Sequence, residues 1–147
     1  MLTLFAALAA LAAVAGQAPA PGAERYAEGQ VWEYRTRPGE EESLLLIQRI
    51  EAVPAFAERG PVYHVSLVGV RFGGPDGPTT LPHLPVSRET LDSSVVRLSE
   101  RRPDFPNPEE GIAVWRQAQG GVFTIPLAEI VAIAERAMQE VMAPADE

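Results

Sequence analysis

The sequence contains no cysteine and no lysine. Without cysteine there is no thiolate nucleophile, no iron–sulfur cluster, no cysteine-ligated zinc and no lipid-modified cysteine behind a leader. Without lysine there is no Schiff-base chemistry, no Ser–Lys pair and no Walker-type phosphate loop. Acid–base chemistry has few candidate groups left, since the chain has two histidines, His64 and His83. These absences argue against an enzyme.

Positive charge is also scarce. The 147 residues carry 12 arginines against 20 acidic residues, for a net charge of -8. Because nucleic-acid affinity comes mainly from cations that neutralise phosphates, this balance argues against a nucleic-acid partner. The length suits one globular domain, which at this size buries enough surface to fold without a disulfide or a metal.

The N-terminus has the features of an export signal. Residues 2–15 form an apolar run that is short for a membrane span, and Ala13-Val14-Ala15 offers a cleavage site of the A-x-A kind. We therefore expect a signal peptide at 1–15, a linker at 16–29, one domain at 30–142 and a tail at 143–147. The mature protein would be periplasmic or secreted, with no stable membrane span. The alternative is an uncleaved apolar N-terminal helix that serves as an anchor.

Three segments are predicted to be β-strands: residues 30–37, 43–53 and 61–72. In the first, apolar and polar residues alternate with a period of two, which predicts Trp32 and Tyr34 on a covered face and Glu33 and Arg35 on an open one. A turn at residues 37–40 favours a hairpin between the first two strands.

The second half of the domain is predicted to be mainly helical. Residues 73–86 hold four prolines and three glycines, which predicts a loop. Helices are expected at 87–100, 107–119 and 126–142, with a short strand at 122–125. The predicted fold is α+β: an antiparallel meander of three to four strands with three helices on one face, in the order β-β-β-α-α-β-α.

Residues 29–48 read G-x-V-W-x-Y-x-T-R-P-G-E-E-x-S-x-L-x-I-Q. This stretch resembles the opening of a family of small uncharacterised bacterial proteins. The resemblance extends along most of the chain and includes His64, the L-P-H-L-P stretch at residues 81–85 and G-V-F-T-I at residues 121–125. It implies a single domain and carries no known activity.

His64 and His83 are the first candidate binding residues. His64 lies two positions before Ser66, so both face one side of their strand, as in a hydrolase. However, there is no G-x-S-x-G, and no carboxylate lies close in sequence to orient the ring. We expect His64 to be a buried structural histidine. His83 lies in the predicted loop, where a functional side chain and a rigid connector are both plausible interpretations.

Arg35 and Arg37 are the other candidate binding residues. They lie on the same face of the first strand, where they are able to grip an anionic partner. Pairing with the neighbouring glutamates is the simpler interpretation. The sequence has no H-E-x-x-H, no H-x-H and no calcium loop, so no metal or other cofactor is expected.

The leading hypothesis is a small exported, non-catalytic domain that binds a protein or a small ligand. One alternative is a metal-free hydrolase or lyase that uses His64. Another is an inhibitor or immunity-type protein, which is often small and acidic. An enzyme requires His64 in a cleft with an acid or hydroxyl near it, whereas a binding module requires an exposed aromatic or apolar surface.

Overall fold

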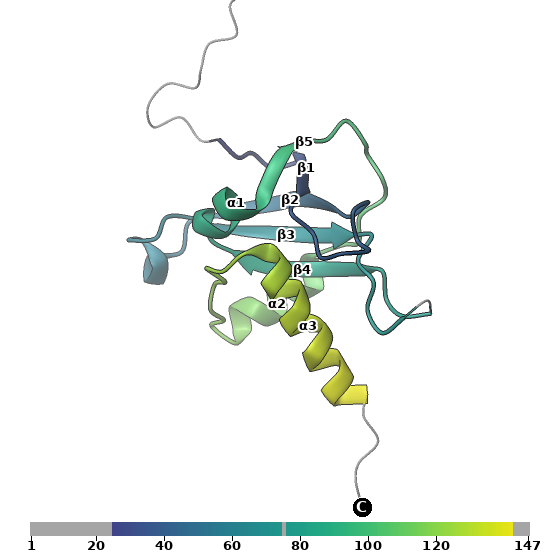
Figure 1. The fold of residues 1–147 in the computed structure, drawn as a ribbon. Coiled ribbons are helices and arrows are strands. Elements are labelled where there is room, and N and C mark those ends of the chain that lie inside the picture. The colour runs from purple at the N-terminus through teal and green to yellow at the C-terminus, as the bar shows by residue number, and fades with distance from the viewer. Residues whose placement is uncertain (1–24, 75, 143–147) are drawn as a thin grey trace, which may run out of the picture.

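An antiparallel sheet of five strands organises the computed structural model, which describes residues 25–74 and 76–142. The strands are β1 (Val31–Tyr34), β2 (Leu44–Glu51), β3 (Val62–Val68), β4 (Thr80–Val86) and β5 (Val95–Leu98). Their order is β4-β3-β2-β1-β5, so the first four form a meander and β5 returns to the free edge of β1 (Figure 1). The prediction of an α+β fold with an antiparallel sheet is confirmed, but the predicted count of three to four strands is wrong.

Helices cover both sides of the sheet. They are α1 (Arg88–Ser94), α2 (Glu109–Gln117) and α3 (Leu127–Met142), and a short 3-10 turn, η1 (Pro54–Phe56), follows β2. α3 crosses the front of the sheet in Figure 1 with α1 beside it, and α2 lies behind the sheet. Three helices are confirmed, but their placement on one face is wrong, because α2 contacts His64 and His83 on the face opposite the apolar core. No helix in the described part of the chain is long and apolar enough to cross a membrane.

The segment predicted to be a loop at 73–86 contains β4. The prolines at positions 82 and 85 argue against a strand inside a sheet, because proline has no N–H to donate. β4 lies at an edge of the sheet, however, where alternate N–H groups have no neighbouring strand to pair with. Edge position therefore explains why the prolines are tolerated, and the sequence alone does not show which strand is at the edge.

The helix predicted at 87–100 is shorter than expected. Ser87 does cap it, since its Oγ accepts from the Thr90 N–H at 3.1 Å. The helix ends at Ser94, and the β-branched pair Val95 and Val96 then opens β5, which pairs with β1. The predicted strand at 122–125 is reduced to one isolated bridge, from Phe123 to Val86. The predicted order β-β-β-α-α-β-α is therefore wrong, and the observed order is β-β-β-β-α-β-α-α.

The apolar core lies between the sheet and the α1/α3 layer. Trp32 and Tyr34 are buried there, as predicted, and Arg35 is exposed, but Glu33, predicted on an open face, is half-buried. Packing begins before β1, because the buried Tyr26 ring contacts Trp32 and Tyr63 edge-on, each at 5.6 Å between ring centroids. The predicted signal peptide, the first part of the linker and the tail at 143–147 lie outside the described residues.

Candidate functional site

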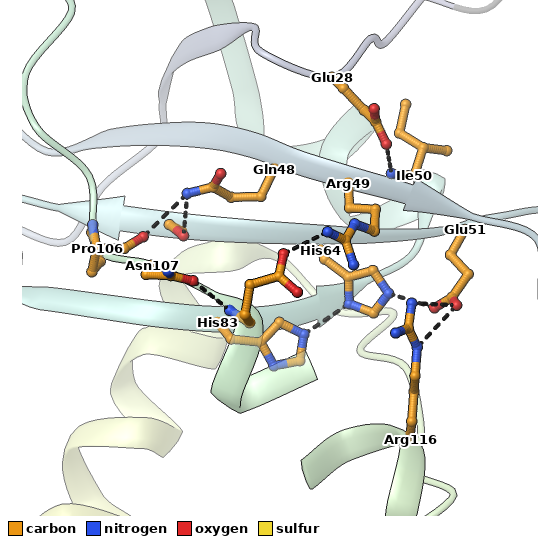
Figure 2. Close-up of polar contacts among 12 residues, drawn as sticks. Glu28, Gln48, Arg49, Ile50, Glu51, His64, His83, Pro106, Asn107 and Arg116 are labelled. Atoms are coloured by element: carbon orange, nitrogen blue, oxygen red, sulfur yellow. Dashed lines mark hydrogen bonds and ion pairs between the residues drawn. The ribbon is translucent and has the colours of Figure 1, made fainter. Parts of the chain in front are cut away.

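The two histidines of the chain meet on the sheet face that α2 covers. His64 projects from β3 and His83 from the neighbouring β4 (Figure 2). Their rings stack at 5.0 Å between centroids, and His64 Nδ1 lies 2.8 Å from His83 Nε2. The two candidates, more than a dozen residues apart in the sequence, are thus brought together by the antiparallel pairing of β3 with β4.

A carboxylate from a third strand orients this pair. Glu51, at the end of β2, lies 2.9 Å from His64 Nε2 through its Oε2. The carboxylate is an acceptor, so the His64 Nε2–H donates to it and His64 Nδ1 accepts from the Nε2–H of His83. No carboxylate lies close to His64 in sequence, but the pairing of β2 with β3 supplies one from across the sheet.

A β-bulge places Glu51 on this face. The register between β2 and β3 shifts between Ile47 and Arg49, with Gln48 as the extra residue. Without the shift, Arg49 and Glu51 would continue the core-facing phase of Ile47. With it, Ile50 packs against the core, and Arg49 and Glu51 face His64 instead.

The chain of polar contacts ends on α2. Arg116 donates to Glu51 Oε1 from Nε at 3.1 Å and from Nη2 at 2.7 Å. Figure 2 shows Arg116 reaching from the helix to the end of β2. We call the four residues Arg116, Glu51, His64 and His83 the relay, because each is linked to the next by a hydrogen bond. Sequence reasoning missed Glu51 and Arg116.

Burial determines the charge state of the relay. His64 is 0% exposed, and desolvation holds its pKa below the usual value although Glu51 opposes this. Burial, with a smaller contribution from His64, lowers the pKa of His83 to about 4. Burial also opposes ionisation of Glu51, but hydrogen bonds from His64 and Arg116 outweigh it and keep its pKa below the usual value. At neutral pH both histidines are uncharged and Glu51 is ionised.

Ser66 is not part of the relay. Its Oγ donates to the carbonyl of Pro82 at 2.6 Å and accepts from Gln48 Nε2 at 3.1 Å. Both nitrogens of His64 are occupied by Glu51 and His83, so no Ser–His pair forms. The expectation that His64 is at least half covered is confirmed, and a hydrolase built on His64 with Ser66 has no geometric support.

A pocket of about 690 Å³ adjoins the relay between η1 and α2. Its apolar walls include Val53, Pro54, Phe56 and Trp115. Its polar lining comes from Glu51, Arg116 and Gln119. Trp115 is partly exposed. Its Nε1–H donates to the Gly121 carbonyl, and its ring meets the His64 ring edge-on at 4.9 Å between centroids.

The candidate arginines, which follow the end of β1, lie elsewhere. Arg37 grips the buried Glu40 with two hydrogen bonds, of 2.7 and 2.9 Å, and also reaches Glu135 of α3. Arg35 is exposed, and its Nη1 lies 3.4 Å from the Ser93 carbonyl. Arg37 therefore joins the hairpin to α3, and the structure does not bring Arg35 or Arg37 to the histidines.

Within residues 25–74 and 76–142, no three His, Asp or Glu side chains are grouped to hold a metal ion. The chain matches no protein-family model, no curated protein and no solved structure. The resemblance of residues 29–48 to a bacterial family stays a prediction. Function is therefore inferred from the geometry of the relay and the pocket.

Proposed function

We propose that the protein is a non-catalytic binding module and that the pocket between η1 and α2 is its ligand site. The observation that carries this proposal is an apolar pocket whose lining includes a guanidinium with free donors. A volume of about 690 Å³ is in the range of small-molecule sites, which combine apolar walls with a few polar groups. The leader expected at residues 1–15 would place this module in the periplasm or outside the cell.

The polar lining of the pocket offers hydrogen-bond donors. Both oxygens of Glu51 are engaged, one by His64 and one by Arg116. Arg116 uses Nε and one N–H of Nη2, and its remaining N–H groups have no hydrogen-bond partner among the described residues. An open edge of a guanidinium favours a planar acceptor such as a carboxylate. The ligand class is therefore a small molecule with an apolar or aromatic body and an anionic or carbonyl group.

Binding of the fluorescent probe 8-anilino-1-naphthalenesulfonate tests the site, because the probe joins an aromatic body to an anion. Phe56→Ala removes an apolar wall outside the core and should weaken binding by about fivefold to tenfold. Ile133→Ala is the control, since it removes an exposed apolar side chain of α3, on the opposite face. Equal affinity of the two variants would refute the assignment.

One observation favours a second candidate, a metal-free hydrolase or lyase. His83 Nδ1 has no hydrogen-bond partner among the described residues, and His64 and Glu51 orient its ring as a general base would be oriented. Against this, neither histidine lines the pocket. Turnover of p-nitrophenyl acetate that His83→Gln abolishes would establish this candidate, and turnover unaffected by it would remove it.

A further inference from the structure

The charges around the relay cancel in the free protein. The groups that act on His64 are Glu51 and Arg49 from β2, His83 from β4 and Arg116 from α2, and Glu109 from α2 reaches this cluster through Arg49. Arg49 pairs with Glu109 and Arg116 pairs with Glu51. With both histidines neutral, the two arginines balance the two carboxylates. An anion added at Arg116 therefore leaves one uncompensated negative charge in a partly buried cluster.

The relay can neutralise that charge by taking up one proton. In the neutral state, the acceptor left open is His83 Nδ1, because the other ring nitrogens are committed to hydrogen bonds. A solvent proton binds there, and the proton on His83 Nε2 passes along the 2.8 Å hydrogen bond to His64 Nδ1. The positive charge then lies on His64, directly beside Glu51. One proton enters: N–H bonds form at His83 Nδ1 and His64 Nδ1, the N–H bond at His83 Nε2 breaks, and the relay gains one positive charge.

We infer, on the basis of the ligand site proposed above, that the pocket binds carboxylate ligands at Arg116 with uptake of one proton by the His64–His83 pair. Two hydrogen bonds of 2.9 and 2.7 Å through Glu51 connect the pair to Arg116, so the two events act on the same carboxylate. Linkage makes the coupling reciprocal: the bound anion favours the protonated pair, and protonation tightens anion binding.

Titration calorimetry with 1-naphthoate tests this inference, and the uncharged 1-naphthamide serves as the matched ligand. The affinity for naphthoate should rise about tenfold from about pH 8 to about pH 5, where the probe is still ionised. The affinity for naphthamide should not change. Buffers of different ionisation heat should report uptake of about one proton per naphthoate at the lower pH and none for naphthamide.

The variant His83→Gln tests proton uptake by the relay without altering the lining of the pocket. The glutamine amide can still donate to His64 Nδ1, but it cannot take up a proton. This variant should bind naphthoate as the unaltered protein does at about pH 8 and should lose most of the tenfold gain at about pH 5. Arg136→Gln, an exposed position on α3, is the control and should keep the full gain.

The outcomes distinguish the two proposals. Binding of both probes without pH dependence or proton uptake would leave the ligand site standing and overturn the coupling. Binding of neither probe at either pH would overturn the ligand site and the coupling together. A pH dependence that His83→Gln leaves intact would show that the proton does not enter through His83 and would also overturn the coupling.

Discussion

The two faces of the sheet are both covered, but by different chemistry. On the face under α1 and α3, β3 contributes Tyr63, Val65 and Leu67 to an apolar core. On the face under α2, the same strand contributes His64 and Ser66, which are equally buried and fully hydrogen-bonded. The first face has no groups in β3 that titrate near neutral pH, whereas the second face couples burial to protonation. The free energy of unfolding should therefore depend on side-chain volume on the face under α1 and α3, and on pH on the face under α2.

The largest expected effect is on the apolar face. Trp32→Ala removes a ring that is 4% exposed and packed against Tyr26, so we expect a loss of about 3–5 kcal/mol in the free energy of unfolding. Trp115→Ala, in the partly exposed pocket wall, should cost clearly less. Urea denaturation of the two variants gives the comparison, and an unchanged midpoint for Trp32→Ala would contradict the assignment of the core.

On the polar face, His64→Gln should cost about 1–3 kcal/mol, because a buried hydrogen-bonded group loses its fit between Glu51 and His83. Far-ultraviolet circular dichroism during urea denaturation measures the loss. Naphthoate binding at about pH 8 should survive, since His64 does not line the pocket. Full stability together with a lost activity would show instead that His64 is catalytic.

The pH dependence of stability should come from the polar face. The pKa of His83 is about 4 in the folded protein against an ordinary 6.5, so below pH 6.5 the unfolded chain takes up the proton first. The free energy of unfolding should then fall by about 1–2 kcal/mol between about pH 7 and about pH 5, with an allowance for partial exposure of the ring. The lowered pKa values of His64 and Glu51 act in the same direction. His83→Gln should reduce this fall in the free energy of unfolding. An equal fall in the variant and in the unaltered protein would contradict the assignment to His83.

The smallest effect concerns the contact between α2 and β4. A Cβ at Gly111 would lie 2.6 Å from His83 Cβ, so Gly111→Ala forces the helix away from the histidine. Overpacking costs about 1–3 kcal/mol and the better helix propensity of alanine returns up to about 1, which leaves a net loss of about 1 kcal/mol. Gly121→Ala is the matched control, because a Cβ there meets nothing within 4 Å. Thermal unfolding of the two variants should differ accordingly, and equal midpoints would show that the helix does not press on His83.

The sequence predicts the parts of this fold that depend on local patterns. Alternation in β1 predicts the buried Trp32 and Tyr34, and Ser87 predicts a helix start. It does not predict β5, because a short strand after α1 forms only where β1 offers a free edge. The missed strands β4 and β5 share a cause, since the formation of each depends on which segments become neighbours in the sheet.

The candidate site shows the same division. Residue type alone makes His64 and His83 candidates, because histidine is rare in this chain and titrates near neutral pH. Nothing near Glu51 in the sequence connects it to a histidine. The bulge at Gln48, which reverses the phase of β2, and the packing of α2 on the far face make that connection. Arg116 was missed for the same reason.

The two edge strands of the sheet differ in how well they can pair with a strand from another molecule. On β4, positions 82 and 85 are prolines, and the segment around Phe123 occupies part of the outer side through its hydrogen bond to the carbonyl of residue 85. β5, at the other edge, contains no proline. Growth of a continuous cross-strand ribbon requires two pairing-competent edges on every molecule. Edge-to-edge pairing at β5 would leave β4 as the outer edge of both molecules, and the prolines there lack the N–H groups that addition of a further strand uses.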